Sequence, residues 1–373
     1  MPMMLNESIN RRPFVAVAFC ALLSPSIRVI PTLIVPIAGE HAWISVAVSI
    51  LPLALLALVL QSFQRSLRAG EGMPELFVRI LGNTLGKGML LIFALWMLFY
   101  CAFVLRVSAH RFISTIFPAS SPLAYIPAMG ALLLMVSLSR FKVLSRLSGI
   151  IRPLLTAVLV LVLILSLPEI HPYTYSVPAV TDIPDIALGT VPVMNALSIW
   201  AYLSFLEGHV ADGLPKAKHF LPSLILTVAL LTGLCYATVG TFGPVLTDKI
   251  NNPFFVMIRG IKVMGALERI EALVIALWFF TDFILAGAMM QAAISALRCV
   301  LGLKIIRPGF SPREGRWLPW LCSALSVACA LTIAKTSTEM TDLSMFIIPG
   351  LNMLFVFVLF PLVFLIGLIR RRV

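Results

Sequence analysis

Long apolar stretches recur along the whole chain, and short segments carrying charge, proline or glycine separate them. A helix of roughly 20 apolar residues crosses a hydrocarbon core about 30 Å thick, so the longer stretches are suited to span a membrane. The pattern predicts ten spans, at about residues 13–38, 41–61, 87–110, 122–138, 150–167, 187–207, 219–240, 268–297, 317–334 and 345–369. We therefore expect an all-α polytopic membrane protein, with residues 1–373 in a single transmembrane domain.

The positions of lysine and arginine predict how these spans are oriented. With both termini in the cytoplasm, most of the 28 basic residues fall in inner segments, as the positive-inside rule requires. The loop from Glu169 to Ile186 has acidic residues but no lysine or arginine, which favours an outer position. The basic residues that do not fall in inner segments are Arg28, Arg106, Arg111, Lys249, Arg259, Lys262, Arg269 and Lys335.

One predicted outer segment, residues 252–265, departs from the charge rule. Its sequence "NPFFVMIRGIKVMG" puts Arg259 and Lys262 on one helical face and Phe254 and Ile258 on the other, which is an amphipathic pattern. We expect a short helix that either lies on the outer surface or plugs an outer vestibule.

Composition narrows the classes of function. The chain of 373 residues is 60% hydrophobic and 12% charged, with a mean hydropathy of +1.03, which excludes a soluble globular domain. The net charge of +12 lies in short loops rather than in one stripe, so no nucleic-acid partner is predicted. The six cysteines stand singly, and no metal site, disulfide framework, cofactor or catalytic motif is indicated.

The middle of the first span contains a proline, two hydroxyl groups and an arginine, in "SPSIR" from Ser24 to Arg28. Pro25 removes a backbone donor, and unsatisfied backbone groups persist in a membrane only where they face protein or water. One interpretation is a kinked helix whose Arg28 extends to the outer interface. The other is a broken helix whose second half begins near Ser26, with its amide groups, its dipole and Arg28 facing an anionic group.

A second interruption is predicted in the sixth span, at Glu207 and Gly208. Either the span ends there with Glu207 in the cytoplasm, or the helix is broken and Glu207 binds a cation, a proton or Arg28. The two predicted breaks, at 24–28 and 204–208, lie in the first helix of each five-helix half, which is typical of inverted-repeat transporters. The predicted repeats are about 13–167 and about 187–369.

Three segments share features with one family of membrane proteins. The segment "VPIAGEHAWIS" (35–45) is similar to that family's entry into helix two, and "SFLEGHVADGLPKAK" (204–218) to its sixth helix and following loop. The segment "NPFFVMIRGIKVMGALERIEALVIALWFFTDFI" (252–284) is similar to its Pro-x-x-x-x-x-Arg segment and its eighth helix. In order and spacing, the chain resembles the spore germinant-receptor B subunits, the GerAB-type branch of the amino acid–polyamine–organocation superfamily.

This resemblance implies a LeuT-like fold of two inverted five-helix repeats with broken helices 1 and 6. It implies a subunit of the spore inner membrane that binds an L-amino acid or another small nutrient, beside an A subunit and a lipoprotein C subunit. The residues that it implies for ligand binding are Ser24, Ser26, Ile27, Arg28, Tyr100, Ser204, Phe205, Leu206, Glu207, Gly208 and Trp278.

Glu207 and Asp282 are the candidates for a proton or an ion pair, because a charged group inside a membrane span is costly and is usually functional. Asp282 could pair with Arg28 or Arg106, or be satisfied by a neighbouring hydroxyl such as that of Thr281.

Two other functions remain open. A proton-coupled amino acid transporter of the same fold, acting alone, would carry its proton on Glu207 or Asp282. A membrane scaffold would have no ligand. A membrane-embedded enzyme would need clustered acids or histidines in an inner loop, and the sequence has no such cluster.

Overall fold

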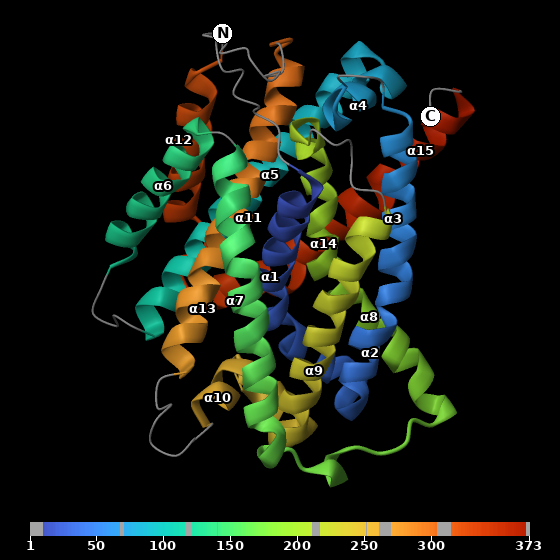
Figure 1. Ribbon diagram of the computed structural model, residues 1–373, viewed down its shortest axis with the longest axis vertical. Helices are drawn as coiled ribbons and strands as arrows, with labels where there is room; N and C mark the ends of the chain where they lie inside the picture. Colours follow the sequence, from blue (N-terminus) through green and yellow to red (C-terminus); the bar gives the residue numbers. More distant parts are fainter. Residues whose placement is uncertain are drawn as a thin grey trace.

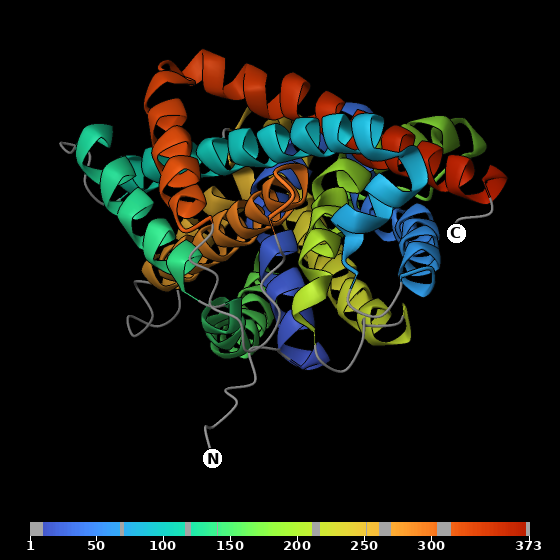
Figure 2. The same cartoon turned by 90° about the horizontal axis from the view of Figure 1, so that it is seen from above.

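The computed structural model is a bundle of helices, shown from the side in Figure 1 and from above in Figure 2. It describes residues 10–67, 71–115, 121–139, 141–210, 217–250, 252–260, 270–303 and 315–370. The longer helices are α1 (Arg11–Ala38), α3 (Ile50–Arg65), α5 (Asn83–Thr115), α6 (Pro122–Leu138), α7 (Phe141–Ser166), α8 (Ile183–Leu197), α9 (Ala217–Lys249), α11 (Ile270–Val300) and α12 (Trp317–Thr332).

Shorter elements connect or extend these helices. The α-helices among them are α2 (Ala42–Val48), α4 (Met73–Leu81), α10 (Pro253–Gly260), α13 (Ser337–Asp342), α14 (Ile348–Met353) and α15 (Phe360–Ile369). The 3-10 helices are η1 (Gly39–His41), η2 (Leu167–Glu169), η3 (Pro172–Thr174), η4 (Val180–Asp182) and η5 (Ser198–His209). Two π-helical turns, η6 (Leu343–Ile347) and η7 (Leu354–Leu359), join α13, α14 and α15 into one continuous helical segment.

Helix α1 lies near the middle of the bundle, where it packs against α7, α8, α9 and α11 (Figure 1). Its apolar residues are buried on several sides; Val17, Phe19 and Ile34, for example, have no exposed surface. A helix that is apolar all round belongs in the interior of a large protein or a membrane. On one side of the bundle, α5 packs along α11, and α6 and α12 pack together beside α5.

The predicted break in the first span is wrong, because α1 is one helix through residues 24–28. Pro25 and Pro31 lie inside it, and each withholds the amide donor that the carbonyl one turn earlier would use. The hydroxyl of Ser26 donates to the carbonyl of Leu22 at 2.6 Å, which keeps this polar side chain satisfied inside the helix. The donors missing at Pro25, Pro31 and Pro36 therefore leave α1 continuous.

The backbone of the sixth predicted span changes earlier than expected. Helix α8 ends at Leu197, and the chain continues at once as the 3-10 helix η5, through Glu207 and Gly208 to His209. The interruption predicted at Glu207 and Gly208 is therefore replaced by a change of helix type that begins at Ser198. A 3-10 helix this long is unusual, and such stretches often mark a functional hinge.

Within the described ranges, seven helical stretches are long and apolar enough to cross a membrane, and α6 and α12 are shorter apolar helices. The protein is thus a multi-pass membrane protein. Each of the ten predicted ranges overlaps a helix, whereas the number of membrane crossings stays a prediction.

The short helix predicted within residues 252–265 is present as α10, and its apolar face is buried. Phe254 and Ile258 are each only 2% exposed, and α10 packs against α1, α7, α9 and α11. This burial favours a plug over a helix lying free on the surface. Arg259 extends outwards and pairs with Glu271 at 2.9 Å, while Lys262 lies outside the described residues.

The loop between α7 and α8 folds back onto the same end of the bundle. Tyr175 stacks on Tyr236 of α9, with 4.4 Å between ring centroids, and its hydroxyl donates to the carbonyl of Tyr236. Near α2, His41 lies 3.3 Å from Asp182. Together with α10, these contacts cover this end of the bundle.

Candidate functional site

The predicted residues of α1 lie in the interior of the bundle. Ser26 and Ile27 are 0% and 5% exposed, and Ser26 uses its hydroxyl within the helix. Pro31 withholds its amide from the carbonyl of Ile27, so a backbone acceptor of a predicted residue loses its usual donor. The side chains of Ser24 and Arg28 lie outside the described part of the structure.

The predicted residues of η5 are divided between a cavity and the core. Ser204 lines a cavity, and its hydroxyl donates to the carbonyl of Ala201 at 2.6 Å. Phe205 packs against Phe77 and Phe93 in the core of this structure, with ring centroids 5.9 and 5.7 Å away. Leu206 has no exposed surface. The side chain of Glu207 and the surroundings of Gly208 are outside the described residues.

Tyr100 and Trp278 belong to different aromatic clusters. Tyr100 of α5 is 4% exposed and packs against Trp96 and Phe103. Trp278 of α11 packs against Phe254 of the plug helix α10, with 6.2 Å between centroids. The described contacts therefore place Tyr100 in the core around α5 and Trp278 beneath α10.

Asp282 forms a buried ion pair with Arg111 of α5, with 3.2 Å between Oδ2 and Nη1. The guanidinium of Arg111 also lies over the ring of Trp278, 4.2 Å from its centroid. Arg106, a predicted partner, instead donates to the carbonyl of Ala334 at 3.0 Å, and the hydroxyl of Thr281 donates to the carbonyl of Trp278. Sequence analysis did not identify Arg111 as the partner of Asp282. The one signal that could have indicated it is that Arg111 is among the basic residues that do not fall in inner segments.

A second polar cluster joins α5, η5 and α14. The indole Nε1 of Trp96 lies 2.9 Å from the Tyr202 hydroxyl and 3.2 Å from Oδ1 of Asn352, and the Tyr202 hydroxyl donates to that Oδ1 at 3.0 Å. All three side chains are buried. Asn352 lies between the π-helical turns η6 and η7, so this cluster ties η5 to the last helical segment.

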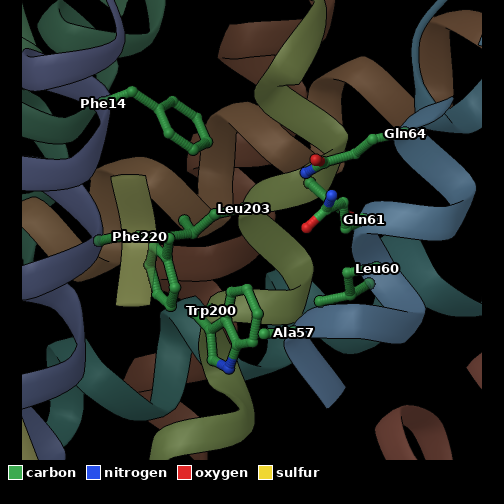
Figure 3. Close-up of a pocket in the computed structure, with 10 residues that line it drawn as sticks. Phe14, Ala57, Leu60, Gln61, Gln64, Trp200, Leu203 and Phe220 are labelled. Carbon is green, nitrogen blue, oxygen red and sulfur yellow. The ribbon is translucent and has the colours of Figure 1, made fainter. Parts of the chain in front are cut away.

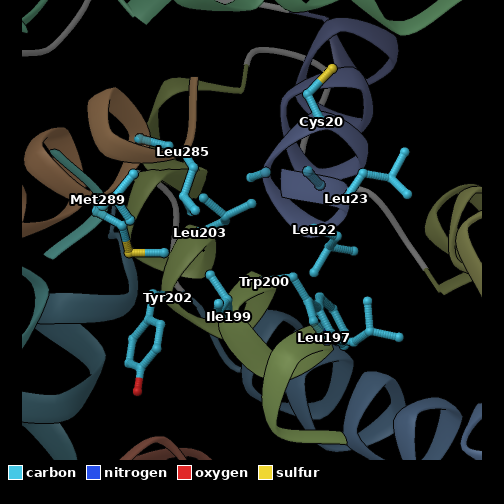
Figure 4. Packing of buried hydrophobic residues seen from close by; sticks show 14 of the residues in the cluster. Cys20, Leu22, Leu23, Leu197, Ile199, Trp200, Tyr202, Leu203, Leu285 and Met289 are labelled. Carbon is cyan, nitrogen blue, oxygen red and sulfur yellow. The ribbon is translucent and has the colours of Figure 1, made fainter. Parts of the chain in front are cut away.

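At mid-depth, the space between α1 and η5 is filled by apolar side chains (Figure 4). Leu22 and Leu23 of α1 and Leu203 of η5 are at most 1% exposed. Leu285 and Met289 of α11 complete this packing and are equally buried.

A cavity opens instead nearer the end of the bundle at which α1 and α9 begin (Figure 3). It has about 20 Å³ of space that a water-sized sphere can occupy, which is room for about one water molecule. The residues that line it come from α1 (Phe14, Ala18), α3 (Ala57, Leu60, Gln61, Gln64), η5 (Trp200, Leu203, Ser204) and α9 (Phe220).

The cavity has an aromatic side and an amide side. Trp200 stacks on Phe220 with 4.3 Å between centroids, while Gln61 and Gln64 extend from the facing helix α3 (Figure 3). Of the lining residues, only Ser204 is among those predicted. Gln61 and Gln64 lie at the end of an apolar span, just before Arg65, so their sequence pattern is that of an ordinary membrane boundary.

Comparisons with known proteins give a family and a fold. The family model Spore_permease, described as "Spore germination protein", matches residues 9–339. "Putative spore germination protein YfkT" of Bacillus subtilis (strain 168) is 24% identical over 149 residues, which are 40% of this chain and 39% of that protein. The match thus spans less than half of that relative.

Among solved structures, a Na⁺-coupled sialic acid symporter in a substrate-bound outward-open state is similar to this chain with a TM-score of 0.63. The identity is 16%, and the match covers 95% of this chain and 80% of the symporter. The two proteins therefore share a fold.

Proposed function

The chain belongs to the Spore_permease family of spore germination proteins, and on that premise we propose that it is the nutrient-binding subunit of a germinant receptor. Its family, its fold and its apolar helices support a membrane permease role. In this proposal it binds an amino-acid-like small solute within the membrane, and binding triggers germination of the spore.

One observation carries the proposal: the cavity lies between α1 and η5, the two helices expected to form the ligand site. Phe14 of α1 and Ser204 of η5 both line it. The lining of this cavity is mostly apolar with a few polar groups, which is the chemical character of small-molecule sites. At mid-depth the space between α1 and η5 is filled by apolar side chains. The cavity therefore lies next to the proposed binding position rather than at it.

We propose a two-state mechanism on a fold of ten spans in two inverted repeats. In one state the solute reaches residues of α1, α5, η5 and α11; in the other the core between α1 and η5 is packed, as here. A solute shifts this equilibrium only by its different affinities for the two states. The residues proposed to hold it are Ser24, Ser26, Ile27, Arg28, Tyr100, Ser204, Phe205, Leu206, Glu207, Gly208 and Trp278.

The proposed partners are an A subunit and a lipoprotein C subunit, in the spore inner membrane with both termini of this chain in the cytoplasm. The change of helix type at Ser198 supports a receptor that moves on binding, because η5 carries both the cavity residue Ser204 and the cluster residue Tyr202. Movement of η5 would reach the last helical segment through Asn352.

A second candidate is a proton-coupled transporter acting alone, and the buried pair of Asp282 and Arg111 favours it. An acid held inside a membrane span is a common proton carrier. Asp282 would exchange its proton as Arg111 moved away, while Glu207 remains the other proposed carrier.

Purified full-length chain in proteoliposomes tests both candidates. We expect labelled L-amino acids to bind the chain, and this binding supports the nutrient receptor. Accumulation inside the vesicles that depends on a proton gradient would favour the transporter. Absence of binding to any of the L-amino acids supplied, with the protein folded, would contradict both proposals and favour a scaffold.

A further inference from the structure

Arg298 is a buried charged residue that the proposed site does not use. It lies near the end of α11, is only 9% exposed, and has its Nε enclosed without a hydrogen-bond partner. The ion pairs found among the described residues do not include it. A buried charge without a counterion is costly, so an anion from outside the described part of the chain would stabilise Arg298.

The burial of Arg298 differs from that of an arginine that only extends into water. Such a side chain buries its apolar stem and keeps its whole guanidinium hydrated, whereas here the guanidinium is enclosed at Nε. The two Nη atoms are not among the enclosed polar atoms that lack a partner, so the tip of the side chain is within reach of a ligand. A guanidinium donates two parallel hydrogen bonds to a carboxylate or a phosphate.

The contacts of α11 show which helices meet near Arg298. Gln291 lies seven residues earlier, which is nearly two turns and therefore the same face of the helix. Its side chain donates to the carbonyl of Val136 at 3.1 Å. Helix α6 ends shortly after Val136, at Leu138. Arg298 therefore lies on the side of α11 at which α6 ends.

The start of α12 lies beside the same end of α11. The amide of Leu303 donates to the carbonyl of Arg298 at 2.9 Å, and a Cβ at Gly315 would lie 3.0 Å from Cδ1 of Leu303. Helix α12 then begins with Trp317, and Trp317 and Trp320 are 52% and 58% exposed. Tryptophan is enriched at the level of the lipid headgroups, which places Arg298 near that level.

The surface around Arg298 favours a lipid over a soluble anion. Leu138 at the end of α6 and Leu321 on α12 are 48% and 53% exposed, and such apolar side chains suit contact with acyl chains. Arg298 also belongs to the predicted inner segments, where most of the basic residues lie. Basic pockets between transmembrane helices on the cytoplasmic side bind anionic lipid headgroups.

We propose that Arg298 binds the phosphate group of an anionic phospholipid in the inner leaflet, where α6 and α11 end and α12 begins. The phosphate is the counterion that the buried guanidinium lacks among the described residues. The acyl chains lie along the exposed apolar side chains of α6 and α12. A ligand that binds only the folded state stabilises it, so the lipid stabilises the bundle at this end. This inference does not depend on the proposed function.

Titration of the purified full-length chain in detergent with phosphatidylglycerol tests this inference, with the unfolding temperature as the readout. We expect phosphatidylglycerol to raise the unfolding temperature of the wild type. Phosphatidylcholine, which has no net negative charge, and inorganic phosphate, which has no acyl chains, should act far less. Arg298→Gln should weaken the apparent affinity for phosphatidylglycerol about tenfold or more, as loss of charge-assisted hydrogen bonds implies.

Arg65→Gln is the matched control, because it makes the same change of charge at an exposed position that ends α3. Helix α3 packs against α8, α9 and η5, away from this end of α11. The titration of Arg65→Gln should therefore equal that of the wild type. Without lipid, Arg298→Gln should be at least as stable as the wild type, because it removes a buried charge that has no counterion.

Three results would overturn the inference. A loss of stability in Arg298→Gln that is equal with and without phosphatidylglycerol would place the partner of Arg298 within the chain. Equal responses of both glutamine variants and the wild type would mean that the lipid acts through general charge. A wild type that responds as strongly to inorganic phosphate would bind a soluble anion. Arg298→Lys keeps the charge but loses the paired donors; its intermediate affinity is the expected result if the glutamine variant misfolds, and an affinity equal to that of the wild type would contradict binding through the guanidinium.

Discussion

At the scale of single residues, the ion pair of Arg111 and Asp282 gives the clearest prediction about the free energy of unfolding. Its side chains are 15% and 4% exposed, and removing one partner of a buried pair costs about 3–5 kcal/mol because a charge is left uncompensated. We expect Asp282→Leu to lower the unfolding temperature strongly, and the double variant with Arg111→Leu to recover part of that loss. Thermal unfolding in detergent measures both.

The pair of Arg259 and Glu271 is the natural control for this measurement. It has a similar geometry, at 2.9 Å, but its side chains are 49% and 36% exposed. Exposed pairs contribute little, because water screens them. Arg259→Leu should therefore leave the unfolding temperature nearly unchanged. A loss as large as that of Asp282→Leu would contradict the importance assigned to burial.

Glu75 of α4 gives a prediction about pH. Burial raises the pKa of its carboxyl, while a hydrogen bond from the Gly72 amide acts in the opposite direction. With the folded pKa above the unfolded one, the folded state gains from protonation, and this gain is lost as the pH rises from about 4.5 through the folded pKa. We expect Glu75→Gln to unfold at a higher temperature than the wild type at pH 7.

The difference should shrink as the pH falls towards 4.5, because both chains then carry a neutral group at this position. Unfolding temperatures measured from about pH 4 to about pH 8 test the sign of the stability difference between Glu75→Gln and the wild type. A glutamine variant that is less stable at neutral pH, or a difference independent of pH, would argue against the effect of burial. Glu169→Gln, in an exposed position, is the control for the chemical change.

At the scale of elements, α1 shows where local signals stop being sufficient. A proline, two serines and an arginine in one span favoured a broken helix, yet α1 is continuous. A sequence shows which residue lacks a backbone N–H donor. It does not show how neighbouring groups and packed helices accommodate the loss of that donor. The seventh span was predicted to end at residue 240, whereas α9 runs on to Lys249 with a kink at Gly243, whose φ is +73°, just before Pro244.

The contact between α6 and α12 depends on one glycine. A Cβ at Gly130 would lie 2.2 Å from Cγ2 of Val327, and the Ser323 hydroxyl donates to the Gly130 carbonyl at 3.1 Å. We expect Gly130→Ala to separate these helices and lower the unfolding temperature, and Val327→Ala in the same chain to restore much of it. Gly149→Ala, with no other atom within 4 Å, should be neutral or slightly stabilising. An equal response at both glycines would contradict this packing.

At the scale of the molecule, hydropathy predicted the positions of the helices far better than the contacts between them. Period and length locate a span from local residues alone, and each predicted range overlaps a helix. Arg111 and Asp282 are far apart in sequence and meet only because α5 packs along α11. The cavity likewise needs α1, α3, η5 and α9 together. Contacts between distant segments are set by tertiary packing, which one sequence does not display.

The orientation of the whole bundle follows from charge, and it can be tested with two single cysteines. Arg65 ends α3 and is exposed, and Val177 in the α7–α8 loop is 90% exposed. An odd number of predicted spans separates them, so they should lie on opposite sides of the membrane. With Cys299 and Cys329 replaced, the other native cysteines are buried. An impermeant maleimide added outside intact cells should label Val177→Cys and spare Arg65→Cys until the membrane is opened. Labelling of both from outside would contradict the predicted topology, because an even number of crossings would then separate the two positions.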